Sequence, residues 1–398
     1  MSHFIPYGRH ALDEDDLKSV EAVLKGDWLT GGSVVEDFEK KLCAIAHSPF
    51  AVSCSNGTTA LHLAMLALDI GPGDVVIVPA ITFLASANAA RFVGADVVFA
   101  DVDPDTGLMT ASTLEQAITG YREPSKIKAV INVDLNGQCG DLEAIYKVAQ
   151  KYHLSVLEDA AHAIGTCYID SKGQKHVIGA NQYSDLTTFS FHPVKTIAAG
   201  EGGAVTCKSE KLAERLKLLR CHGMIRTKEN WQYTDQGFDE TNTPNPWYYE
   251  MQDLGYNYRI SDINCALGLN QLTKLDQFKV QRQRMAEKYD AILKDIAHIS
   301  PLTKSPTSDT AWHLYVIKID FKGIGKTRAH VMNSLRDQGI GTQVHYMPLY
   351  RQPYYRKLYG TQELPGAEAY FDSCLSIPLY IGLTDQQQET IGNALKAL

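Results

Sequence analysis

The feature that most restricts the fold is an alternation of β-branched runs and helical patterns in the first half of the sequence. Strand-like runs lie at 50–54, 75–78, 97–100, 129–133 and 155–157, and helical patterns lie at 60–68, 84–92 and 142–152. Such alternation is typical of a parallel sheet covered by helices on both faces. We therefore predict an α/β fold that binds its ligand at the carboxyl ends of the strands.

Polar residues follow several of these strands. The turn Asn56-Gly57-Thr58 comes after the first, Thr82 and Phe83 follow the second, and the segment 158–162 ends the fifth. We expect them to meet at one edge of the sheet. Backbone N–H groups and hydroxyls at 56–58 suit a phosphate, although an ordinary capped helix start has the same pattern. The missing dinucleotide fingerprint disfavours a hydride-transferring dehydrogenase.

Lys195 lies near the middle of the run 185–206, between two apolar segments. Gly200, Gly202 and Gly203 follow it, so we predict a tight loop between two strands. Most lysines are solvated surface charges. A lysine that loses solvation in such a loop becomes neutral more readily, and a neutral amine can form a Schiff base with an aldehyde.

Three other residues have both a structural and a functional interpretation. Asp159 at a strand end is a helix cap or a structural acceptor, or it holds a proton on a pyridine nitrogen. His162 orients Asp159 or is a hydrogen-bonded core histidine. Phe83 stacks on a planar cofactor or belongs to the core.

Composition excludes several classes of protein. The chain has 398 residues, 44% of them hydrophobic and 21% charged, which indicates a soluble protein with a large and a small domain. A net charge of -8 argues against general nucleic-acid binding, and no uninterrupted apolar stretch predicts a membrane span. Eight cysteines without a Cys-x-x-Cys pair fit reduced thiols, and without a secretory signal we expect a cytoplasmic protein. No metal site is predicted.

The C-terminal part has its own pattern of elements. Helices are predicted at 260–272, 274–293, 327–338 and 385–398, and strands at 312–320 and 342–346. These elements suggest a smaller α/β domain.

The order of the motifs resembles that of the DegT/DnrJ/EryC1/StrS family of sugar aminotransferases, over nearly the whole chain. The resemblance rests on 53–59, Thr82-Phe83, 158–162, 189–195 with 200–203, 255–259 and 343–346. It implies the pyridoxal-phosphate fold type I of aspartate aminotransferase, with a mostly parallel seven-stranded sheet. The implied domains are 1–272, which carries the insertion 226–250, and 273–398.

The resemblance also assigns residues around pyridoxal 5'-phosphate. It implies that Lys195 binds the cofactor aldehyde, Asp159 faces the pyridine nitrogen, Phe83 stacks on the ring and His162 lies beside it.

The phosphate of the cofactor has its own implied ligands. These are Gly57, Thr58 and Ser190, with Asn257 from the neighbouring subunit, so the resemblance implies a homodimer with shared active sites.

The substrate residues implied for the sugar-facing walls are Tyr7, Thr30, His345 and Tyr346. A nucleotide diphosphate entering an acidic protein needs nearby cations. The candidates are Arg9, Arg226, Lys228 and Arg259.

Within the family, 222–224, 257–259, 266–272 and 339–350 resemble the branch that acts in pseudaminic acid biosynthesis. This implies transfer of the amino group of L-glutamate to C4 of a UDP-linked 4-keto-6-deoxy-N-acetylhexosamine. The insertion 226–250 is longer than in that branch, and it is either a lid over the sugar nucleotide or an interface loop.

Other functions stay open. They are amination of another nucleotide sugar, C3-keto or dTDP-linked, and a non-catalytic protein that binds cofactor or sugar nucleotide. A dehydratase branch of the family has histidine in place of the lysine, so Lys195 argues against it.

Overall fold

The computed structural model describes residues 4–233 and 235–398. Its centre is a seven-stranded sheet in the order β1-β9-β8-β5-β4-β2-β3. The strands are β1 (Phe50–Cys54), β9 (Gly203–Cys207), β8 (Leu186–Ser190), β5 (Ser155–Asp159), β4 (Ile127–Val133), β2 (Val75–Pro79) and β3 (Asp96–Ala100). Strand β9 is antiparallel to both neighbours, and the pairs from β8 to β3 are parallel. The predicted α/β fold with a mostly parallel seven-stranded sheet is confirmed.

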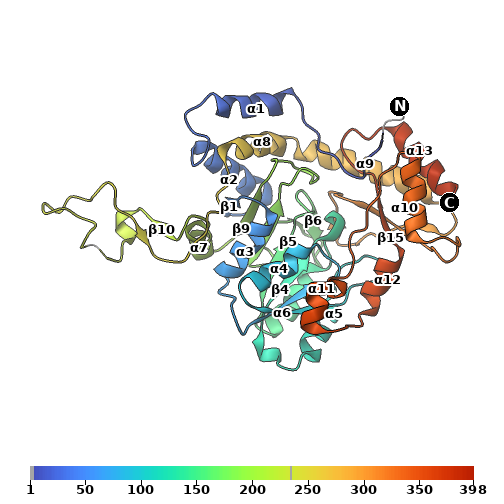
Figure 1. Cartoon of the computed structure of the whole chain (residues 1–398), viewed down its shortest axis with the longest axis horizontal. Helices are drawn as coiled ribbons and strands as arrows, with labels where there is room; N and C mark the ends of the chain where they lie inside the picture. Colours follow the sequence, from blue (N-terminus) through green and yellow to red (C-terminus); the bar gives the residue numbers. More distant parts are fainter. Residues whose placement is uncertain (1–3, 234) are drawn as a thin grey trace.

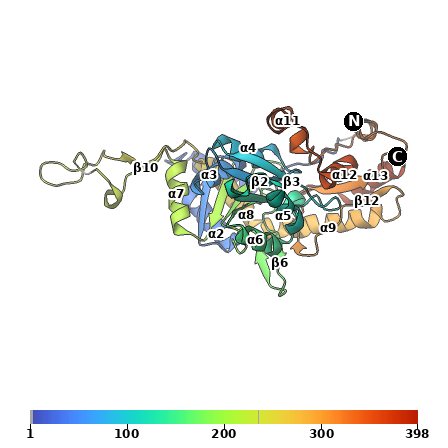
Figure 2. The same ribbon diagram turned by 90° about the horizontal axis from the view of Figure 1, so that it is seen from below.

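Helices cover both faces of this sheet (Figures 1 and 2). Side chains alternate along a strand, so Val76 and Val78 of β2 pack with one set of helices while Val75 and Ile77 pack with the other. The first set is α3 (Gly57–Ala67), α4 (Leu84–Phe92) and α7 (Glu210–Arg220). The second set includes α5 (Ala111–Gly120) and α6 (Leu142–Lys151). Helix α2 (Ser33–Ala46) packs on β1.

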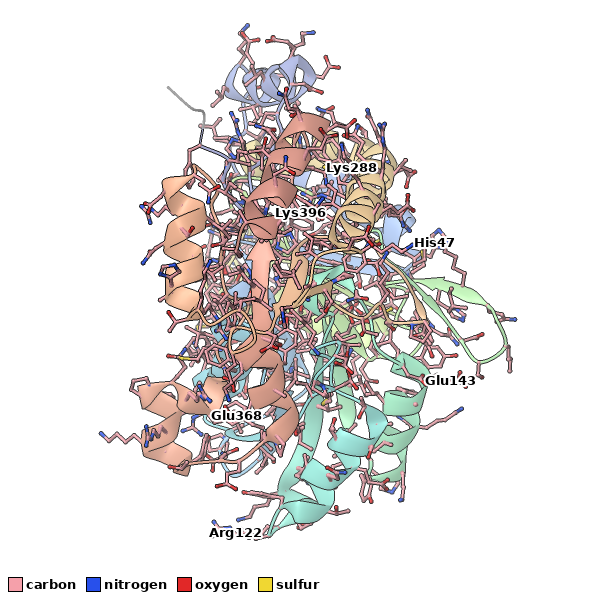
Figure 3. The ribbon with its side chains drawn as sticks, turned by 90° about the vertical axis from the view of Figure 1, so that its right-hand side faces the viewer. His47, Arg122, Glu143, Lys288, Glu368 and Lys396 are labelled. Atoms are coloured by element: carbon pink, nitrogen blue, oxygen red, sulfur yellow. The ribbon has the colours of Figure 1, made fainter. Side chains whose placement is uncertain are left out.

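A second hydrophobic core lies in the C-terminal part of the chain. It joins a three-stranded sheet to the helices around it, through buried side chains such as Tyr289, Ile317, Val331 and Ile391. The elements are α9 (Leu275–Leu293), β12 (Ile299–Pro301), β14 (Tyr315–Ile319), α10 (Arg328–Asp337), β15 (Cys374–Ile377) and α13 (Asp385–Lys396). Figure 3 shows Lys288 of α9 and Lys396 of α13 at this end of the molecule. The division of the chain at residue 272 stays a prediction.

The segment between β10 (Met224–Ile225) and β11 (Glu250–Met251) forms an arm that projects from the body of the molecule (Figures 1 and 2). The arm has its own packing, because the ring of Trp231 meets that of Tyr248 edge-on at 4.7 Å between centroids. Below these rings, the Glu250 carboxylate accepts hydrogen bonds from the backbone N–H groups of Gln232 and Tyr233.

The remaining elements connect these parts. They are α1 (Glu14–Leu24), β6 (Cys167–Ile169), β7 (Lys175–Val177), α8 (Asp262–Thr273), β13 (Ser308–Asp309), α11 (Pro353–Tyr359) and α12 (Pro365–Ser373), with short 3-10 turns at Pro124–Lys126, Leu135–Gly137, Lys228–Asn230 and Leu349–Arg351. No helix in the described parts of the chain has both the length and the apolar character needed to cross a membrane.

The predicted strand at 342–346 is wrong. Only Gln343 pairs with the three-stranded sheet, in an isolated bridge to Ser376 of β15. The next residues leave the sheet, and Val344, His345 and Tyr346 line a cavity instead of pairing with a strand. Pro348, which follows, has no N–H with which the strand could continue.

Candidate active site

A cavity of about 660 Å³ opens at the carboxyl ends of the central strands. The structure brings together here most of the residues singled out in the sequence: Tyr7, Gly57, Thr58, Phe83, Asp159, His162, Ser190, Lys195, His345 and Tyr346. The sheet edge supplies one wall, and the segment 343–347 supplies much of the opposite wall. The polar residues that end separate strands therefore do meet in space.

Lys195 lies in the loop between β8 and β9, as the sequence predicts. The loop is closed at its base by a hydrogen bond from Phe191 N–H to the Gly202 carbonyl, 2.8 Å. At the next residue, Gly203, a Cβ would lie 2.3 Å from the Asn56 carbonyl oxygen. Only glycine therefore lets the end of the lysine loop approach the turn at 56–58. Burial lowers the pKa of the half-buried Lys195 to about 8, and the charge of Asp159 partly offsets this. An amine with this pKa is partly neutral near pH 7.

Asp159 is only 5% exposed and has two fixed hydrogen bonds. Its Oδ2 accepts from Ser86 Oγ at 2.7 Å, and its Oδ1 accepts from Ala161 N–H at 3.2 Å. Ser86 lies in α4 and is itself 2.7 Å from Thr82 Oγ1. Burial raises the pKa of Asp159, and these hydrogen bonds and Lys195 oppose the rise. The carboxylate is thus held in one orientation, in the same cavity as an amine.

His162 is held as a neutral ring. Its Nδ1 accepts from the backbone N–H of Asn136 at 3.2 Å, which assigns the ring proton to Nε2, and Nε2 lies 3.3 Å from the Tyr346 hydroxyl. Burial and the nearby Lys195 lower the pKa of His162 well below its usual value. Phe83, 53% exposed, lies at the mouth with its ring centroid 5.9 Å from that of Tyr346.

The start of α3 forms a cradle for an anion. The Asn56 side chain caps the helix by accepting from Thr59 N–H at 2.9 Å, and the first helical N–H groups at Gly57 and Thr58 have no partner within the helix. Gly57 packs so closely on Ser190 that a Cβ would lie 2.8 Å from the Ser190 Cβ. Backbone donors and a hydroxyl therefore converge at one end of the cavity.

Six candidate residues do not line this cavity in a single chain: Arg9, Thr30, Arg226, Lys228, Asn257 and Arg259. Thr30 pairs with Ser261, and Asn257 pairs with Cys221, each in an isolated bridge. The Arg259 Nη1 lies 3.2 Å from the Cys221 Sγ, and the Arg226 guanidinium lies 5.8 Å from the centroid of the Tyr249 ring in the arm. Among the described residues that line the cavity, Lys195 is the only lysine or arginine.

The sequence analysis missed several residues that shape the cavity, chiefly Ser86, Asn136 and His313. Asn136 had a signal, because the pair Asn136-Gly137 is typical of a turn, and Asn136 does adopt a positive φ of 64°. His313 had a weaker signal, as a polar residue near the start of the predicted strand 312–320. Ser86 inside a helix had none.

Comparison with known proteins gives consistent similarities. Residues 10–396 match the model of the DegT/DnrJ/EryC1/StrS aminotransferase family. The spore coat polysaccharide biosynthesis protein SpsC of Bacillus subtilis (strain 168) is 37% identical over 398 residues, covering 99% of this chain and 97% of SpsC.

Solved structures agree with this. The PLP form of Spr1654 from Streptococcus pneumoniae has a TM-score of 0.86 at 29% identity, over 99% of this chain and 98% of that chain. PseC of Helicobacter pylori, an aminotransferase involved in the biosynthesis of pseudaminic acid, has a TM-score of 0.86 at 29% identity, over 98% of each chain.

Proposed function

Because the chain belongs to the DegT/DnrJ/EryC1/StrS aminotransferase family, we propose that it transfers the amino group of L-glutamate to C4 of a UDP-linked 4-keto-6-deoxy-N-acetylhexosamine. It is a pyridoxal-phosphate-dependent sugar aminotransferase. The observation that carries the proposal is the placement of Lys195 and Asp159 in one cavity with an anion cradle at its end.

The cavity residues fit pyridoxal phosphate at its three anchoring points. Lys195 supplies an amine for the aldehyde, Asp159 a carboxylate for the pyridine nitrogen, and the cradle at Gly57 and Thr58, with Ser190, donors for the phosphate. The close contact of Gly57 with Ser190 supports this, since a larger residue would fill the cradle. Phe83 and His162 line the same cavity and would cover the ring and lie beside it.

Each residue then has a chemical task. The bound cofactor supplies an aldehyde that receives the amino group and a ring that delocalises electrons from a carbon losing its proton. Lys195, neutral in part at pH 7, takes the proton from the α-carbon of the donor and later returns one to the sugar carbon. With the cofactor bound, the Asp159 carboxyl group would face the pyridine nitrogen and keep it protonated, so that the ring can accept electrons. His162 and Tyr346 close the cavity beside the ring.

We infer that the active enzyme is a homodimer with shared sites. A cofactor phosphate and a nucleotide diphosphate bring several negative charges to a cavity in which Lys195 is the one lysine or arginine among the described lining residues. A second copy of the chain would bring Asn257 to the phosphate and Arg226 and Arg259 to the nucleotide. We assign the arm to this interface, because it is ordered by its own contacts while Tyr233 and Trp247 remain 73% and 66% exposed.

The sugar is the part of the proposal with a specific alternative. The similarity to PseC supports a role in pseudaminic acid biosynthesis, whereas the higher identity to SpsC favours a sugar used for a spore coat polysaccharide. The family chemistry is the same for both, because sugar pockets vary on a common cofactor site.

The test is incubation with UDP- and dTDP-linked 3-keto and 4-keto sugars plus glutamate, with the product configuration read by NMR. We expect a 4-amino sugar from the UDP-linked 4-keto substrate. Turnover only with dTDP sugars would overturn the nucleotide assignment, and no turnover with any of them would favour a binding protein. Lys195→Ala should abolish both turnover and the visible absorbance of the lysine-bound cofactor, whereas the exposed Lys172→Ala should preserve both.

A further inference from the structure

His313 is held at the cavity by its main chain. Its N–H donates to the Asn136 carbonyl at 2.9 Å, and its carbonyl accepts from Nη1 of Arg282 at 3.3 Å. One contact comes from the turn after β4 and the other from α9. The side chain, 4% exposed, lines the cavity, and its ring centroid lies 4.5 Å from that of His162 with the two rings tilted by 51°.

The imidazole of His313 has no hydrogen-bond partner among residues 4–233 and 235–398, and its Nδ1 is fully buried. The other two histidines of the cavity do have partners. His162 bonds Asn136 and Tyr346, and the Nδ1 of His345 lies 2.7 Å from Ser376 Oγ. Because Nδ1 is fully buried, Nε2 is the ring nitrogen that a ligand in the cavity can contact, and it too has no partner in the described chain. Polar groups in such walls are nearly always paired, so we expect a ligand to accept from Nε2.

The charge around His313 shows what kind of ligand fits. Arg282 is 2% exposed and donates its Nη1 only to carbonyl oxygens, those of Trp312, His313 and Leu379, while its Nε has no partner. No carboxylate pairs with Arg282 in the described chain. Burial lowers the pKa of His313 well below its usual value, and the charges of Lys195 and Arg282 lower it further. The ring is therefore neutral.

We propose that the imidazole of His313 donates a hydrogen bond to a carboxylate of the amino donor, with the buried Arg282 behind it. The inference rests on the proposed function, in which a dicarboxylic amino acid is the donor. The keto sugar carries no carboxylate, so this contact selects for the donor. His313 is a binding residue, and Arg282 is a positioning residue that acts through the main chain of His313 and through its charge.

The test uses the full-length, cofactor-loaded enzyme and glutarate, a dicarboxylate that binds without reacting because it has no amino group. Glutarate affinity is read from the change in cofactor absorbance, and affinity for UDP-N-acetylglucosamine is measured beside it. We expect His313→Leu to weaken glutarate binding about tenfold or more, because it removes a hydrogen bond to a charged group, and to leave UDP-sugar affinity unchanged.

Two further variants separate binding from packing. His313→Gln keeps an N–H donor and should bind glutarate more tightly than His313→Leu, whereas the exposed His330→Gln should match wild type. Equal glutarate affinity in wild type and His313→Leu would overturn the inference, as would an equal loss of UDP-sugar affinity. If wild type itself does not bind glutarate, the donor in the proposed function is wrong instead.

Discussion

Asp134 and Glu158 form a buried acid pair beside Asp159. They lie on the face of the sheet edge that points away from the cavity, since neighbouring strand residues point to opposite faces. Both are at most 4% exposed, and burial together with the charge of Glu158 raises the pKa of Asp134 well above its usual value. Asp134 Oδ2 and Glu158 Oε1 have no hydrogen-bond partner in the described chain. Two neighbouring buried carboxyl groups do not both ionise, so we infer that this pair shares one proton.

This pair makes stability depend on pH. Burial raises the pKa of Glu158 to about 7 from its ordinary value of 4.5. An acid whose pKa is higher in the folded state contributes its full stabilisation when the pH is below its unfolded-state pKa. That stabilisation is lost as the pH rises through the folded-state pKa, here about 7. We expect the free energy of unfolding of the cofactor-free protein to fall by on the order of 3 kcal/mol between pH 4.5 and pH 9 from this pair.

Glu158→Gln should flatten this pH profile, because the amide donates to Asp134 without a titrating proton. Urea unfolding across the pH range measures it, with the exposed Glu240→Gln as control. An unchanged slope in Glu158→Gln would show that the pair does not share a proton.

At the scale of elements, the start of α3 links the sheet to the anion cradle. Gly57→Ala places a methyl group 2.8 Å from the Ser190 Cβ, although alanine suits a helix. Overpacking of this kind costs about 1–3 kcal/mol, so we expect cofactor affinity to fall about tenfold or more while the helix still forms. Cofactor release on dialysis, followed by absorbance, measures this. Gly71→Ala, which has open space around it, is the matched control, and the prediction fails if both variants keep the cofactor equally.

Sequence patterns locate best the strands of the central sheet and the helices that pack on it. Strands β2 and β4 and helix α4 were predicted to within two residues, because their apolar runs are set by the core itself. Segment 342–346 has a strand-like sequence too, but its side chains line a cavity, and only the tertiary fold decides this. No prediction was made for α2 or α7, although α7 has apolar residues at helical spacing.

The same distinction applies to the site. Lys195, Asp159 and the turn at 56–58 follow strands, so the parallel topology alone brings them to one edge. Ser86, Asn136 and His313 contribute through contacts between segments distant in sequence, which no local pattern encodes.

At the scale of the whole molecule, a shared site can be tested by mixing two inactive variants. Lys195→Ala removes the amine from a chain's own cavity, whereas Asn257→Ala removes a group that the chain gives to its neighbour. In a mixed dimer, one site then has both an intact Lys195 and an intact Asn257. We expect mixing after partial unfolding and refolding to restore a fraction of the wild-type activity.

Lys195→Ala mixed with Asp159→Asn is the control, because both residues line the same cavity of one chain and no intact site can form. Restoration in the control, or none in the Asn257→Ala mixture, would contradict a shared site. Sedimentation of each variant checks that dimers are present.

The two walls of the cavity are supported very differently. The lysine loop is bound at both ends to adjoining central strands, whereas the opposite wall at 343–347 is joined to its sheet at one residue, Ser376, which pairs with Gln343 and contacts the His345 ring. Substitutions in that second wall can therefore accumulate at little cost to the machinery of amination. Related genes can thus diverge toward new sugars while they keep the residues that transfer the amino group. Directed evolution of this enzyme toward another sugar should start at segment 343–347.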